Sequence, residues 1–117
     1  MNTPINGFYA AYLIGSVSQD LAMLILRNGQ IVGVDVVGAR FDGNYADAQD
    51  TGYTVSLNVR LAPSMSLIQG GTTGQEGDDY TLSFHFPANF LSQEFVRIDT
   101  KYGPINAKLV KLRGIDD

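Results

Sequence analysis

The sequence predicts an all-β protein in which eight antiparallel strands form an up-and-down barrel, with at most one short helix. Three features indicate this class. Apolar and polar residues alternate with a period of two along much of the chain, which is typical of strands with one dry and one wet face. An Asn-Gly pair separates two apolar segments, as in a tight hairpin. Glycines recur inside the strand segments, where they mark bulges or sharp bends.

The N-terminal part is expected to hold four strands. The first covers about Gly7–Gly15, the next two lie within residues 21–38 and meet at Asn28-Gly29, and the fourth covers about Ala39–Ala46. The Asn-Gly pair suits a hairpin because both residues tolerate the positive φ angles of the turn. The second and third strands are apolar on both faces. One of those faces therefore needs a further cover, either a partner chain or the rest of the domain.

The other four strands are expected at about residues 53–61, 79–87, 95–100 and 104–113. The strand at 53–61 alternates most cleanly, and its apolar phase is Tyr53, Val55, Leu57, Val59 and Leu61. The segment "PANFLSQEF" is the only one that looks helical, and it can supply a single turn after its proline. Residues 62–79 are glycine-rich and polar, which predicts a long loop at the rim of the barrel.

Eight consecutive antiparallel strands fit either a sandwich or a barrel, and the glycines favour the barrel. Gly33, Gly38 and Gly43 are evenly spaced through the third and fourth strands, where a closing sheet must coil most. Closure also removes exposed sheet edges and leaves room for side chains or one small ligand. Without repeats or linker composition, residues 1–117 are expected to form a single β-barrel domain.

Composition argues against several classes of protein. The net charge of −4 disfavours nucleic-acid binding, which needs clustered Lys and Arg. The absence of cysteine excludes thiol catalysis and cysteine-ligated zinc. The apolar run at residues 8–15 is too short to span a membrane and has no basic flank, so we expect a cytoplasmic protein without membrane contact. Charged residues make up only 17%, which suggests extra apolar surface at a dimer interface or around a ligand cavity.

Patterns for catalysis and metal binding are weak, so we expect no enzymatic activity, no cofactor and no metal. His85, the only histidine, lies on the polar face of its strand and is expected to face solvent. Asp35 interrupts an apolar strand and is expected to point into the barrel or an interface as a satisfied structural group, with Arg40, Arg60 or a tyrosine hydroxyl as partner. The alternative is a hydrolase or isomerase that uses His85 with Asp35.

Two sets of residues are candidates for binding. A ligand cavity would be lined by the apolar phase of the strands, including Val55, Leu57, Val59, Leu82, Phe84 and Leu109. Acidic residues form two groups, one at Asp42, Asp47 and Asp50 and the other at Glu76, Asp78 and Asp79. Such groups are typical of solvated loops, and a surface that docks a partner is the alternative.

Several segments resemble one bacterial family. The segments "NGFYAAYLI", "LAMLILRNGQIVGVD" and "ARFDGNY" follow a pattern of a Gly-aromatic-Tyr strand, an apolar strand entering an Asn/Asp-Gly turn with a following G-x-D, and an aromatic-x-Gly close. The final "GPINAKLVKL" looks like the last strand of the same family. This pattern is similar to that of the negative regulators of type III secretion, first described as repressors of the enterocyte-effacement locus.

The resemblance implies a lipocalin-like eight-stranded barrel that forms homodimers and regulates by protein–protein contact, without enzymatic activity. In the founding member, a compact acidic run after the aromatic-x-Gly close contacts a transcriptional activator. The matching region here, "NYADAQDTGY", holds only Asp47 and Asp50, which become the predicted partner-binding residues. The alternative function is a lipocalin-like barrel that binds a small apolar ligand.

Overall fold

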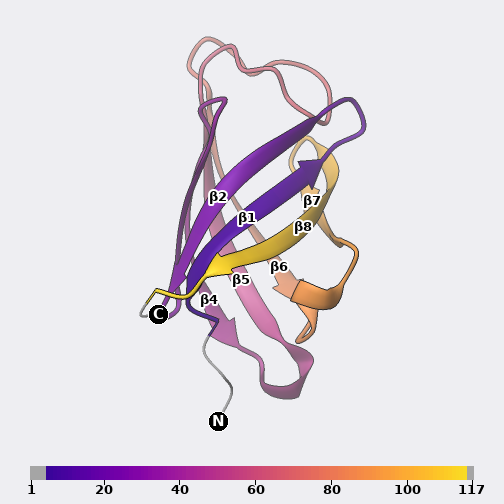
Figure 1. The fold of residues 1–117 in the computed structure, drawn as a ribbon. Helices are drawn as coiled ribbons and strands as arrows, with labels where there is room; N and C mark the ends of the chain where they lie inside the picture. The colour runs from indigo at the N-terminus through magenta and orange to yellow at the C-terminus, as the bar shows by residue number, and fades with distance from the viewer. Residues whose placement is uncertain (1–4, 116–117) are drawn as a thin grey trace.

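The computed structural model describes residues 5–115, which form eight antiparallel strands coiled into a nearly closed barrel (Figure 1). The strand bounds lie within a few residues of those predicted, because alternation of period two is a local signal. The strands are β1 (Gly7–Ile14), β2 (Gln19–Arg27), β3 (Gln30–Asp35), β4 (Arg40–Asp47), β5 (Tyr53–Leu61), β6 (Asp78–Phe86), β7 (Val96–Thr100) and β8 (Gly103–Arg113).

The strand order confirms the predicted up-and-down barrel. Strands β1 to β6 pair in sequence order, β7 pairs with β8, and β8 returns to pair with β1, where Ala11 lies opposite Leu109. This β1–β8 pairing curls the sheet back on itself. The two end strands, β6 and β7, flank the remaining gap without a ladder between them. All eight strands belong to one sheet, which excludes the alternative of a two-sheet sandwich.

Turn chemistry and close strand approach explain two of the sequence signals. Asn28 and Gly29 have φ angles of 50° and 87°, as the tight β2–β3 hairpin requires. A Cβ on Gly43 would lie 2.1 Å from the carbonyl oxygen of Ser56, so β4 and β5 approach too closely there for any side chain. Gly38 differs from the prediction, since it lies in the β3–β4 turn with a φ angle of 116° and not inside a strand.

Helical structure in the described residues is limited to two single 3₁₀ turns. The turn η2 (Phe90–Ser92) falls within the segment that the sequence singled out as helical. The turn η1 (Gln49–Thr51) lies in the β4–β5 connection. No helix among residues 5–115 is long and apolar enough to cross a lipid bilayer.

One end of the barrel is filled by aromatic side chains around Phe90. Its ring stacks on Phe86 with a centroid separation of 4.9 Å, and it meets the edge of Tyr53 at 5.9 Å. Tyr9, which is fully buried, completes this aromatic cluster and donates its hydroxyl to the carbonyl oxygen of Ile5 at 2.7 Å. Burial raises the pKa of the Tyr9 phenol to about 12, so the hydroxyl stays a hydrogen-bond donor.

The opposite end is covered by the β5–β6 connection, residues 62–77, which we term the lid (Figure 1). Thr73 organises the lid, because its buried hydroxyl donates to the carbonyl oxygen of Ala62 and accepts the N–H of Met65. The lid is also attached to the β1–β2 turn. The carbonyl oxygen of Ile68 accepts the N–H groups of Val17 and Ser18, at 2.9 and 3.1 Å. A segment predicted only as a rim loop therefore closes the barrel.

Candidate ligand cavity

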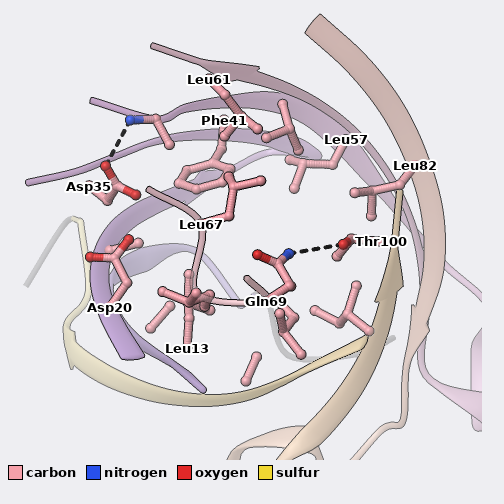
Figure 2. A pocket seen from close by; sticks show the side chains of 18 of the residues that line it. Leu13, Asp20, Asp35, Phe41, Leu57, Leu61, Leu67, Gln69, Leu82 and Thr100 are labelled. Atoms are coloured by element: carbon pink, nitrogen blue, oxygen red, sulfur yellow. Dashed lines mark hydrogen bonds between the residues drawn. The ribbon is translucent and has the colours of Figure 1, made fainter. Parts of the chain in front are cut away.

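A cavity of about 120 Å³ lies inside the barrel between the aromatic cluster and the lid (Figure 2). Every strand contributes to its wall, and the lid supplies the residues from Met65 to Gln69. The wall is almost entirely apolar, because the inward phase of each strand carries aliphatic and aromatic side chains. The side chains of Leu57, Leu82 and Leu13 point toward its centre in the close view (Figure 2).

The structure places five of the six predicted cavity residues in this wall. They are Leu57, Val59, Leu82, Phe84 and Leu109. The sixth, Val55, is buried in the core but does not line the cavity, which corrects the prediction. On β5, Val55 lies between Tyr53 and Leu57, and Tyr53 packs against the aromatic cluster. Val55 is therefore nearer than Leu57 to the aromatic end of the barrel. The alternation of apolar and polar residues identifies which residues face inward, but it does not identify their position along the barrel axis.

Sequence reasoning missed the contribution of the lid. Leu67 is 7% exposed, and Ile68 and Gln69 also line the cavity. The three apolar residues of "MSLI" within an otherwise polar connection are the sequence signal that could have indicated a buried role. Gln69 Nε2 donates to the Thr100 hydroxyl at 3.0 Å, which fastens the lid to β7 across the mouth of the cavity (Figure 2).

Two carboxyl groups, Asp20 on β2 and Asp35 on β3, lie together at one side of the cavity (Figure 2). Asp35 Oδ1 accepts three backbone N–H groups of the β3–β4 turn, from Val37 at 3.0 Å and from Gly38 and Ala39 at 2.8 Å. Asp35 therefore points into the barrel and is a satisfied structural group, as expected. Its partners are not the expected Arg40, Arg60 or tyrosine, because the chain turns immediately after it and supplies its own donors.

Burial and the neighbouring carboxyl group of Asp35 favour the protonated form of Asp20. The pKa of Asp20 is raised to about 7, first because burial disfavours its charged form and then because Asp35 hydrogen-bonds to it and repels its charge. The N–H of Leu21 bonds to Asp20 Oδ1 at 2.8 Å and opposes this effect.

His85 lies on the outer, solvent-facing side of β6, as its polar phase predicted. Its Nε2 atom is 2.6 Å from the carbonyl oxygen of Thr51, which orients the ring. Asp35 lines the interior of the barrel instead. The structure thus does not assemble the His85–Asp35 pair on which the catalytic alternative depends.

The predicted partner-binding residues lie at the end of the barrel opposite the lid: Asp47 is the last residue of β4, and Asp50 lies in the β4–β5 connection (Figure 1). Asp47 Oδ1 accepts the N–H of Gln49 at 2.6 Å, which shapes the 3₁₀ turn. Asp50 is exposed within that turn. Both residues are thus exposed at the junction of β4 and the β4–β5 connection, and neither lines the cavity.

In the second acidic group, the negative charges of Asp78 and Asp79 are balanced by neighbouring hydrogen-bond donors and cations. Asp78 accepts hydrogen bonds from Lys101 and Tyr102, and these two donors lower the pKa of its carboxyl to about 2. Asp79 accepts a hydrogen bond from Asn58 at 2.7 Å and pairs with Arg60 at 3.3 Å. Within residues 5–115, no three His, Asp or Glu side chains are grouped as a metal site would need. This group therefore helps to join β6 to the β7–β8 turn.

The outer surface of β3, β2, β1 and β8 carries a continuous apolar area, which we term the outer apolar face. Cross-strand register joins its members, since Tyr12 lies opposite Leu21 and Met23 lies opposite Val34. Its side chains are between 39% and 54% exposed, and they are Tyr12, Ile14, Leu21, Met23, Val32, Val34, Val110 and Leu112. They expose on the order of 700 Å² together, more than the few hundred Å² usual for a monomeric protein.

Comparison with known proteins identifies no relative. No model of a known protein family matches this chain, and no curated protein or solved structure matches it either.

Proposed function

We propose that this protein is a non-enzymatic binding protein whose barrel holds a small apolar molecule beneath the lid. The observation that carries the proposal is the cavity of about 120 Å³ with its aliphatic and aromatic wall. An apolar cavity of about 150 Å³ stays empty of water and accepts a benzene-sized molecule. The cavity here has a similar size and chemistry, so its natural guest is expected to bury a group of about six to eight non-hydrogen atoms.

Movement of the lid would widen access to the cavity, because lid residues form one of its walls. The lid is held at its outer end by the Ile68 carbonyl oxygen, by the Gln69–Thr100 bond, and by the Ser16 hydroxyl, which donates to the Gln69 carbonyl oxygen at 3.0 Å. Such exposed or half-buried hydrogen bonds each contribute about 1 kcal/mol. Opening the lid therefore costs a few bonds and leaves the barrel ladders intact.

Toluene binding to the full chain tests this proposal. Titration of ¹⁵N-labelled protein with toluene should shift amide signals of residues that line the cavity. Leu82→Phe fills the cavity from β6 and should weaken toluene binding about tenfold or more. Leu91→Phe makes the same exchange at an exposed position in η2 and should leave binding unchanged. Equal binding by both variants would contradict a site inside the barrel.

A second candidate function is regulation by protein–protein contact, and the outer apolar face favours it. This face presents about as much area as one partner contributes to a standard interface, about 800 Å². We propose that two copies associate through it, and that the dimer captures a protein partner through Asp47 and Asp50. A cytoplasmic regulator that sequesters a transcriptional activator, as in type III secretion control, is the form that the sequence resemblance suggests.

Light scattering after size-exclusion chromatography tests the dimer. The outward-facing Met23 is central in the outer apolar face, with Ala10 and Val34 opposite it on the neighbouring strands. Met23→Lys should convert a dimer to a monomer, because a buried unpaired ammonium is strongly disfavoured. Thr81→Lys, on the exposed side of β6, is the control and should not change the mass. A monomeric parent protein would contradict this candidate and leave the cavity proposal untouched.

A further inference from the structure

The ionisable side chains that can carry charge in the cavity wall are acidic and not basic. Among the described residues that line it, Asp20 and Asp35 are the charged side chains, and neither Lys nor Arg nor His contributes. Tyr80 is the remaining titratable group in the wall, and burial raises the pKa of its phenol, which keeps it neutral. A guest with a polar head therefore meets negative charge or hydrogen-bond acceptors at the carboxyl pair.

The carboxyl pair is also rigidly placed. Asp35 is held through Oδ1 by its three backbone N–H donors, and Asp20 Oδ1 is held by the N–H of Leu21. Each group thus retains Oδ2 for its neighbour or for a guest. Both side chains come from adjacent strands that pair in register, with Ala22 opposite Asp35, so the two carboxyl groups do not depend on a mobile loop for their position.

We propose that the cavity selects cationic amphiphiles, with a primary ammonium head at Asp20 and Asp35 and an apolar body under the lid. This inference rests on the proposed function of the cavity and adds the chemical class of its guest. An ammonium group offers three donors and a positive charge to two carboxyl groups that have no cation of their own. A carboxylate guest, such as a fatty acid, would meet like charge and find no counter-charge in the wall.

Four compounds that share one ring test the selection. Toluene measures the apolar contribution alone, and benzylamine, benzyl alcohol and benzoate add a cationic, a neutral and an anionic head. In titrations of the full chain at pH 7.5, benzylamine should bind about tenfold more tightly than benzyl alcohol, as a charge-assisted pair at a half-buried site predicts. Benzoate should bind more weakly than either.

Substitutions of Asp20 and Asp35 test whether these two carboxyl groups cause the preference for benzylamine. Asp20→Asn and Asp35→Asn each remove one carboxylate at nearly constant volume, and each should reduce the affinity ratio of benzylamine to toluene about threefold or more. Asp42→Asn is the matched control, because Asp42 is exposed on the outer side of β4. Raising the pH from 6 to 8 should tighten benzylamine binding to the parent protein, because Asp20 loses its proton. The same change should have little effect on Asp20→Asn.

Each result has a distinct meaning. If toluene binds and benzylamine is not preferred, the selection is wrong and the apolar cavity remains. If benzylamine is preferred but neither carboxyl variant changes its ratio to toluene, the head group lies elsewhere and the inference is also wrong. If no compound binds, the proposed function fails and the inference fails with it.

Discussion

The raised pKa of Asp20 predicts how stability depends on pH. In the folded state this carboxyl titrates at about 7, whereas its ordinary value is 3.8. Between these values the folded protein binds more protons than the unfolded chain, so the free energy of unfolding falls as the pH rises. The contribution of the protonated group is fully present below about pH 4, and it is lost as the pH rises through about 7.

The size of this pH effect on the free energy of unfolding follows from the same pKa of Asp20. Without solvent screening, the pKa shift of Asp20 would lower the free energy of unfolding by at most about 3 kcal/mol between pH 5 and pH 8, because one pKa unit corresponds to about 1.36 kcal/mol. Solvent screening at the half-buried rim reduces this to about 1 kcal/mol. Asp20→Asn keeps a neutral donor facing Asp35, so it should lack this part of the pH dependence.

Urea denaturation followed by circular dichroism measures the effect. The free energy of unfolding is determined at pH 5 and pH 8 for the parent protein, for Asp20→Asn and for the surface control Asp42→Asn. The loss between the two pH values should be about 1 kcal/mol smaller in Asp20→Asn than in the other two proteins. Equal losses in all three proteins would refute the raised pKa of Asp20.

Three further predictions concern the fold and the β4–β5 loop. Gly43→Ala should destabilise the barrel by about 2 kcal/mol or more, because a Cβ there would lie 2.1 Å from a backbone oxygen; denaturation with unchanged stability would contradict the close approach of β4 and β5. Phe90→Ala should cost about 3–5 kcal/mol by emptying the aromatic cluster, measured in the same way, and a loss below about 1 kcal/mol would argue against that packing. Asp47→Lys with Asp50→Lys should weaken capture of a protein partner in pull-down experiments while the circular dichroism spectrum stays that of the folded barrel, and undiminished capture would exclude these two residues as the contact.

Several parts of the fold were predictable because the signals are local. Alternation along residues 53–61 identifies a strand and its inward face without knowledge of its neighbours, and the structure places β5 at those residues. The Asn28-Gly29 pair likewise encodes its own turn geometry. Gly43 indicated close backbone approach, although the partner atoms on β5 became known only from the structure.

The parts of the site that depend on register were not predictable. Asp20 was overlooked because nothing in its own segment distinguishes it from a surface acid. Its role follows from the β2–β3 pairing, which sets it beside Asp35. Val55 and Val59 share a strand and a phase, yet only Val59 lines the cavity, because position along the barrel axis depends on strand tilt and on what fills each end.

The amino-acid pattern alone was enough to predict an all-β chain of eight antiparallel strands, the residues that face inward, and an outward apolar area on the second and third strands. Those properties depend on backbone geometry that repeats every two residues. Three features followed only from the three-dimensional arrangement of the strands: the β5–β6 connection folds over the barrel, an apolar space remains beneath it, and Asp20 and Asp35 from different strands lie together at its side. These features depend on contacts between residues that are distant in the sequence, and a local sequence pattern does not reveal such contacts.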